Sequence, residues 1–245
     1  MILDFQIIAS VFPSLLSATK VTLALSLCIL VLGVMIGIPL GLLNAGRNRV
    51  LRWLSEIYIL IFRGTPPMVQ LFVVYFGLSQ FEAVRESFLW PVLRSAYWCA
   101  VIALGLNSGA YVARMFAGAL RAIPAGQIEA AKALGLGPVA SFLTIRAPLA
   151  FRTMLPAYCN EVIMTVKVTA LASTITVQEL MGRARSEVND TYAPYEVLLS
   201  TAAIYLALIY GLSWFFAWLE QHLNPTRTGR SADKTPATLS IRQEG

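Results

Sequence analysis

The segment that decides the fold is residues 126–148, GQIEAAKALGLGPVASFLTIRAP. It stands in a chain that is otherwise largely apolar. Good helix formers predict a short helix over residues 127–134. Gly135 follows where helices commonly end, so we expect a positive φ there, and a second short helix is expected over residues 138–145. Two short helices joined by a tight turn between membrane spans would form a rigid projection.

The composition excludes an ordinary soluble domain. Of the 245 residues, 57% are hydrophobic and 13% are charged, and the mean hydropathy is +0.68, which predicts several membrane spans. The net charge of +6 does not require a nucleic-acid partner, because Lys and Arg collect in the cytoplasmic loops of membrane proteins. Asp4 precedes any Lys or Arg and no small-residue cleavage site follows, so no signal peptide is expected.

Catalytic and metal-binding chemistry has no candidate residues. The three Cys lie in apolar stretches without paired spacing, and His222 is the only His, which argues against a disulfide framework and a zinc site. No Ser/His/Asp set can be built around one His, and no phosphate-binding GxxxxGK[ST] loop is present. We therefore expect no catalytic residue, no metal and no cofactor in this chain.

Five apolar stretches predict an all-α membrane protein with five transmembrane helices. The first covers residues 21–43, after an interfacial helix expected within residues 1–20. The second, residues 54–78, is broken by Arg63-Gly64-Thr65-Pro66-Pro67, a pattern tolerated only against other protein or a wet cavity. The others cover residues 97–120, 155–180 and 197–218, and residues 79–96 and 181–194 are expected to be loops.

Three glycines in the first span predict close helix packing. Gly33, Gly37 and Gly41 recur every four residues, which puts them on one helix face where another helix can approach.

The basic residues predict the orientation. With the N-terminus outside and the C-terminus inside, most of the 19 Lys and Arg residues fall in cytoplasmic segments. This orientation also places residues 126–148 in the cytoplasm. We divide the chain into an N-terminal periplasmic or interfacial segment, residues 1–18, and a membrane domain, residues 19–220. A polar cytoplasmic tail, residues 221–245, is expected to be disordered.

The 126–148 segment also carries a resemblance. Glu129-Ala130-Ala131, Gly135, Ile145 and Pro148 stand at the spacing of the EAA loop in permease subunits of ATP-binding-cassette (ABC) importers, with Ala147 where the family has Leu.

Over about residues 19–225 the chain resembles the amino-acid branch of those permeases. FRGTP at residues 62–66, followed by Gln70, and PAYCNEV at residues 156–162 are similar to motifs of the histidine, lysine–arginine–ornithine, octopine and nopaline permease subunits. One departure is Arg114, where the branch usually has Glu, and this charge reversal puts any family role of that position in doubt.

The resemblance implies a type I importer architecture in the bacterial inner membrane. It implies four kinds of partner: a second, homologous permease subunit, two ATP-binding subunits that hold ATP and Mg, a periplasmic solute-binding protein, and the lipid bilayer. No nucleic acid is expected. Glu129, Ala130, Ala131 and Gly135 would couple the chain to the ATPase, with the two alanines forming a small-residue face that another protein can approach closely.

The resemblance also implies a cargo, a basic amino acid such as histidine, arginine, lysine or ornithine, or a related opine. A permease for polar or neutral amino acids such as glutamine is the alternative. Two further classes are a non-transporting membrane scaffold, which the polar residues inside spans disfavour, and an intramembrane enzyme, which the missing catalytic residues disfavour.

Candidate substrate residues follow from charge inside the spans. Asn160 and Glu161 would contact the cationic group of the cargo, because a carboxylate in a span needs a partner. The alternatives for Glu161 are a fixed ion pair with Lys167 or Arg63, or a contact to the partner subunit. Arg63 would hold an α-carboxylate or satisfy carbonyls freed by the prolines, and Tyr111 would pack or line the path.

Overall fold

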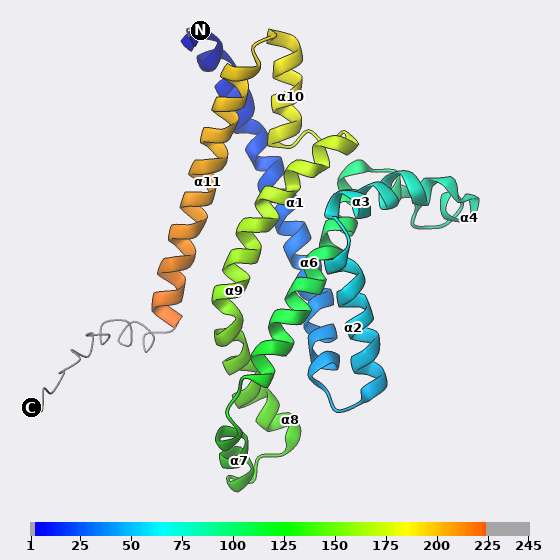
Figure 1. The fold of residues 1–245 in the computed structure, drawn as a ribbon, viewed down its shortest axis with the longest axis vertical. Helices are drawn as coiled ribbons and strands as arrows, with labels where there is room; N and C mark the ends of the chain where they lie inside the picture. Colours follow the sequence, from blue (N-terminus) through cyan, green and yellow to red (C-terminus); the bar gives the residue numbers. More distant parts are fainter. Residues whose placement is uncertain (1–2, 224–245) are drawn as a thin grey trace, which may run out of the picture.

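The computed structural model describes residues 3–223, and these residues contain helices and no strand, as expected for an all-α protein. Three helices are long and apolar enough to cross a membrane: α1 (Phe5–Ala45), α6 (Ala96–Arg121) and α11 (Pro194–Leu223). A fourth span is added if a bent helix pair that begins with α2 (Arg49–Gly64) counts as one. In Figure 1 these helices and α9 (Ala147–Val168) run along the long axis of the molecule.

Helix α1 is continuous over 41 residues, so no break in the helix separates the expected interfacial segment from the expected first span. The Asp4 side chain caps the helix by accepting a hydrogen bond from the Gln6 amide at 2.8 Å. Pro13 and Pro39 lie inside the helix without ending it. At 1.5 Å per residue α1 is about 60 Å long, about twice the roughly 30 Å of a bilayer core. The division placed after residue 18 therefore falls inside a helix.

The α1–α6 contact is the tightest interface of the fold, and it uses the three glycines as predicted. A Cβ added at Gly33 would lie 2.8 Å from Ser108 Oγ, and one at Gly37 would lie 2.5 Å from Val112 Cβ. At Gly41 it would lie 2.9 Å from the Ala113 carbonyl oxygen. The backbone of α1 can therefore lie against α6 only because these positions carry no side chain.

The second apolar stretch breaks at the predicted place and turns sharply. After α2 ends, α3 (Pro67–Phe72) and the short turns η1 (Val73–Gly77) and η2 (Leu78–Gln80) continue at 99° to α2. The expected loop that follows contains two short helices, α4 (Glu82–Arg85) and α5 (Trp90–Leu93). Figure 1 shows this arm leaving the bundle sideways.

Two amide side chains satisfy the carbonyls freed at this break. Gln70 Nε2 donates to the carbonyls of Phe62 at 2.9 Å and Thr65 at 3.1 Å. Asn107 Nδ2, from α6, donates to Phe62 O at 2.7 Å and to Gln70 Oε1 at 3.1 Å. The structural role considered for Arg63 is therefore filled by Gln70 and Asn107.

The 126–148 segment forms two short helices, as predicted. Helix α7 (Ala125–Ala133) is followed by Gly135 with φ of +74°, and α8 (Pro138–Ser141) begins two residues after Leu136. The chain then passes through a π turn, η3 (Phe142–Arg146), directly into α9. Helix α9 therefore begins well before residue 155, the expected start of the fourth span.

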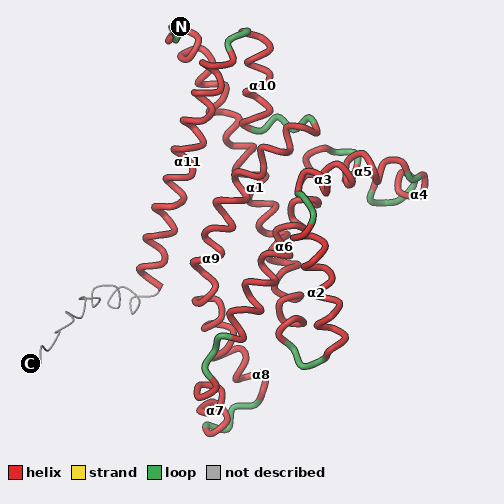
Figure 2. The backbone as a smooth tube through the Cα atoms, in the orientation of Figure 1, coloured by secondary structure: helices red, strands yellow, loops and turns green. Residues whose placement is uncertain are grey.

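At the opposite end, two expectations fail. The helix ends at Val168 rather than near residue 180, and a 3-10 segment, η4 (Thr169–Ile175), follows. Residues 181–194 were expected to be a loop, but most of them belong to α10 (Leu180–Thr191). Ser14 of α1 helps to hold this helix: its Oγ donates to Glu187 Oε1 at 2.5 Å and accepts from Arg183 Nε at 2.6 Å. Figure 2 shows α10 beside the N-terminal end of α1.

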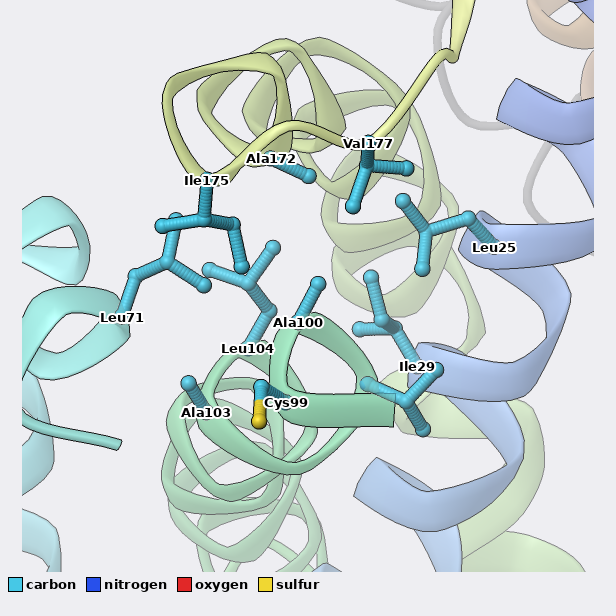
Figure 3. Close-up of a cluster of buried hydrophobic side chains, with 11 residues drawn as sticks. Leu25, Ile29, Leu71, Cys99, Ala100, Ala103, Leu104, Ala172, Ile175 and Val177 are labelled. Carbon is cyan, nitrogen blue, oxygen red and sulfur yellow. The ribbon is translucent and has the colours of Figure 1, made fainter. Parts of the chain in front are cut away.

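A buried apolar cluster joins four elements near the centre of the molecule. Figure 3 shows Leu25 and Ile29 of α1 facing Leu104 of α6, with Leu71 of α3 and Ile175 of η4 beside them. Ile29 and Leu104 also line a cavity that contains polar side chains.

Candidate functional site

A cavity of about 390 Å³ lies between α6 and α9, and we call it the central cavity. Its α9 wall is one face of that helix, because the lining residues recur at helical spacing. Its α6 wall contributes both polar and apolar side chains. The lining residues are Ile29, Pro67, Leu104, Asn107, Ser108, Tyr111, Met115, Ala157, Asn160, Glu161, Met164, Thr165 and Val168.

Glu161 is the only acidic side chain lining the central cavity. Its Oε1 accepts a hydrogen bond from Ser108 Oγ at 2.8 Å. Within residues 3–223 it forms no ion pair, and Lys167 is exposed and not part of the lining. A fixed pair of Glu161 with Lys167 or Arg63 is therefore not present, and the carboxylate retains acceptor capacity toward the cavity.

Asn160, Tyr111 and Arg63 come together around the same cavity. Asn160 and Tyr111 belong to its lining. The Arg63 guanidinium carbon lies 4.8 Å from the centroid of the Tyr111 ring, a cation–π distance. The structure thus brings three of the four predicted substrate residues, Asn160, Glu161 and Tyr111, to the central cavity. Arg63 contacts Tyr111 but lines a neighbouring groove instead.

Arg114 lies on a different surface. It lines a shallow groove between α2 and α6 together with Glu56, Arg63 and Trp53, and it does not line the central cavity. The charge reversal at this position therefore does not place a positive charge in the central cavity.

The predicted coupling residues divide between surface and interior. Glu129 and Ala130 are exposed on α7, but Ala131 is 0% exposed and packs inside the chain. The predicted small-residue face therefore loses one of its two alanines. Sequence reasoning missed the apolar side chains around Gly135: Leu134 is 77% and Val139 is 69% exposed. The sequence contained a signal for this surface: apolar residues flank a predicted turn in a loop at the membrane surface, where they would be exposed.

Sequence reasoning also missed Glu179, a second interior carboxylate. It lies between η4 and α10 and is 0% exposed. Glu179 was counted within the expected span over residues 155–180, because a hydropathy average over a long window changes little with a single charged residue. Among residues 3–223, no group of three or more His, Cys, Asp or Glu side chains could hold a metal ion.

Comparison with known proteins gives one consistent result. The family model described as binding-protein-dependent transport system inner membrane component matches residues 33–225. The octopine transport system permease protein OccM of Rhizobium radiobacter is 45% identical over 225 residues, covering 92% of each chain. The histidine/lysine/arginine/ornithine transport system permease protein HisM of Escherichia coli K12 is 41% identical over 215 residues, covering 84% of this chain and 90% of that protein.

A solved structure agrees with these relatives. The crystal structure of an amino acid ABC transporter with histidines has a chain that superposes with a TM-score of 0.80 at 30% identity, covering 91% of this chain and 100% of that one. The family match over most of the length and the identities above show that the chain belongs to the inner membrane components, or permeases, of binding-protein-dependent transport systems.

Proposed function

We propose that this chain is the transmembrane permease subunit of an ATP-driven importer that carries a basic amino acid, or an opine derived from one, across the bacterial inner membrane. The observation that carries the cargo class is Glu161, an acidic side chain that lines the central cavity and has, within residues 3–223, one hydrogen bond and no ion pair. The names of two relatives, an octopine permease and a histidine/lysine/arginine/ornithine permease, support the same class.

The central cavity can recognise both ends of such a cargo. Glu161 and Asn160 would hold the cationic side chain, because an unpaired carboxylate in a low-dielectric site favours a cation. Arg63, held over Tyr111, would meet the α-carboxylate with its guanidinium fork. Each ion loses hydration on entry, so the net preference is about a few kcal/mol.

Five spans remain our proposal for the topology, with the N-terminus outside and the C-terminus inside. Helix α9 is the added span: its 22 residues are about 33 Å long, enough for a bilayer core, and it runs alongside α6. Residues 126–148, which we call the coupling loop, lie at the same end of the molecule as the α1–α2 turn. Basic residues are frequent in both segments. An impermeant thiol reagent applied to intact cells should label Ser87→Cys and leave Gln127→Cys unlabelled; the reverse pattern would overturn the orientation.

Energy for transport would come from partner subunits. We propose that two ATP-binding subunits hold ATP and Mg, that a second permease subunit completes the pathway, and that a periplasmic solute-binding protein delivers the cargo. The surface for the ATPase would be Glu129, Ala130 and Gly135 together with exposed Leu134 and Val139. These apolar side chains lie at the tip of a projection and provide the desolvated contact that a protein interface needs.

The turn at Gly135 tests the coupling surface. A Cβ at Gly135 would meet nothing within 4 Å, so a substitution acts through the backbone conformation at φ of +74°. Val is disfavoured at this φ whereas Asn tolerates it. We expect Gly135→Val to insert normally and to lose ligand-stimulated ATPase activity, with Gly135→Asn as the matched control near wild type. Normal uptake by Gly135→Val would remove the coupling assignment.

The cargo is tested by uptake into proteoliposomes that contain the complete transporter. Arginine, histidine, octopine and glutamine are compared at equal concentration with the matching solute-binding protein. We expect the cationic amino acids or the opine to be taken up in preference to glutamine. A preference for glutamine would favour the neutral amino-acid alternative, and no uptake of any of them together with normal assembly would favour a scaffold.

A further inference from the structure

A second cavity, of about 620 Å³, lies between the α1–α2 turn and the coupling loop, and we call it the basic cavity. Three cationic side chains line it: Arg47 from the turn, Lys132 from α7 and Arg146 from η3. No Asp or Glu belongs to its lining. The other walls are largely apolar, with Leu42, Leu120, Ile128, Leu136 and Phe142.

The three cations have no acidic partner in the part of the chain that the structure describes. None of them forms an ion pair, and no side-chain hydrogen bond joins them to residues 3–223. The Nε of Arg146 is buried and has no acceptor, and its guanidinium lies 5.9 Å from the Phe142 ring centroid. Buried donors on charged groups are normally satisfied, but residues 3–223 supply no acceptor for Arg146 Nε.

A neighbouring arginine, by contrast, has hydrogen-bond acceptors within the chain. Arg121, at the end of α6, donates from one Nη2 atom to the Asn44 carbonyl at 2.6 Å and to Asn44 Oδ1 at 2.7 Å. Arg121 thereby fastens α6 to the end of α1. The side chains of Arg47, Lys132 and Arg146 hold no such structural contact, so their convergence on one cavity needs another explanation.

We propose that the basic cavity binds the phosphate headgroup of an anionic phospholipid. Cationic side chains at the membrane surface attract anionic headgroups, and basic pockets between helices at that level suit them. The apolar walls select an amphiphile: they match the glycerol and the first methylenes of an acyl chain, which a free phosphate lacks.

The bound headgroup would join the coupling loop to the bundle. Arg47 comes from the turn after α1, whereas Lys132 and Arg146 belong to the coupling loop, Lys132 in α7 and Arg146 in η3 before α9. A headgroup phosphate between them carries one negative charge, which reduces the repulsion among the three positive side chains around the cavity. The lipid thus sets how firmly the loop is held against the membrane domain.

The test uses the complete transporter in nanodiscs that contain phosphatidylglycerol and phosphatidylcholine in equal amounts. Native mass spectrometry of the released complex measures which lipid is retained. We expect phosphatidylglycerol to be enriched over phosphatidylcholine, and Arg146→Gln and Arg47→Gln each to lower its retention about fivefold. The control is Arg52→Gln, which removes an exposed charge from the same end of the molecule outside the basic cavity.

Three results would overturn the proposal. Equal retention in Arg146→Gln, Arg47→Gln and Arg52→Gln would show that the basic cavity does not hold the lipid. Retention of inorganic phosphate with no preference for phosphatidylglycerol would assign the cavity to a free anion. Retention of phosphatidylglycerol only after the ATPase subunits are removed would make it a protein contact. If Arg146→Gln does not assemble, Arg47→Gln, at an exposed position, decides alone.

Discussion

The two interior carboxylates of this permease, Glu161 and Glu179, have opposite surroundings. Glu179 accepts hydrogen bonds from the Gly182 amide at 2.8 Å, the Tyr205 hydroxyl at 3.1 Å and the Thr22 hydroxyl at 3.4 Å, and it is 0% exposed. Glu161 accepts one, from Ser108, and lines a cavity. The hydrogen bonds of Glu179 therefore fit a structural role, and the position of Glu161 at the cavity fits the cargo-binding role that we propose for it.

Glu179 is structural because its donors come from separate helices. It caps the N-terminus of α10, Thr22 belongs to α1 and Tyr205 belongs to α11. The Thr22 hydroxyl in turn accepts from the Leu180 amide at 3.0 Å. A carboxylate with this many donors is expected to fasten helices together, whereas one left with free acceptor capacity beside a cavity is available to a cargo.

The largest effect is expected from Glu179→Ala. The change removes the α10 cap and leaves the Gly182 amide and the Tyr205 hydroxyl buried without an acceptor, so we expect a loss of about 3 kcal/mol of stability. Thermal unfolding of the purified complex and the amount inserted in the membrane measure it. Glu179→Gln, which keeps an acceptor oxygen, should lose less. A Glu179→Ala complex that melts like the wild type would contradict the structural assignment.

Glu161→Gln should act on transport and not on stability. It keeps the size and an acceptor for Ser108 but removes the charge, so we expect about a tenfold lower kcat/KM for arginine or octopine, equivalent to about 1.4 kcal/mol. The melting temperature should be unchanged or higher, because a buried charge is lost. Proteoliposome uptake and thermal unfolding measure the two quantities on the same preparation. Wild-type uptake of arginine would show that Glu161 does not hold the cargo.

The smallest effect is expected from Tyr205→Phe, which removes one donor from Glu179 and keeps the ring. We expect a loss of about 1 kcal/mol of stability and an unchanged uptake rate per folded complex. Tyr210→Phe on the exposed face of the same helix is the control. If Tyr205→Phe instead lowers uptake at unchanged stability, Glu179 belongs to the transport pathway and the contrast with Glu161 fails.

Local patterns predicted the features that depend on few residues. The glycine spacing in α1, the break at Pro66 and the helix–Gly135–helix turn follow from backbone sterics, so they could be recognised in the sequence. Asn160, Glu161 and Tyr111 were singled out from their positions inside spans and from the family motifs, and all three line the central cavity.

The structural features that were not predicted depend on contacts between segments distant in the sequence. The sequence of α10 is polar and looks like a loop, and Ser14, more than 150 residues away, contributes to its stability. Arg63 was considered as one partner of the freed carbonyls because it lies next to the prolines in sequence, whereas Asn107 reaches the Phe62 carbonyl from α6. The burial of Ala131 likewise depends on how α7 folds back, which helix periodicity alone does not give.

The glycine contact between α1 and α6 has a mechanical consequence. Sliding one helix along the other would drive Val112 or Phe116 into backbone that has no room for them. The Asn107 and Gln70 amides fasten the bent second span to the same pair. Any rearrangement of the membrane domain would therefore carry α1, α6 and the bend after α2 as one rigid unit, and the change would fall on less tightly packed elements such as α11.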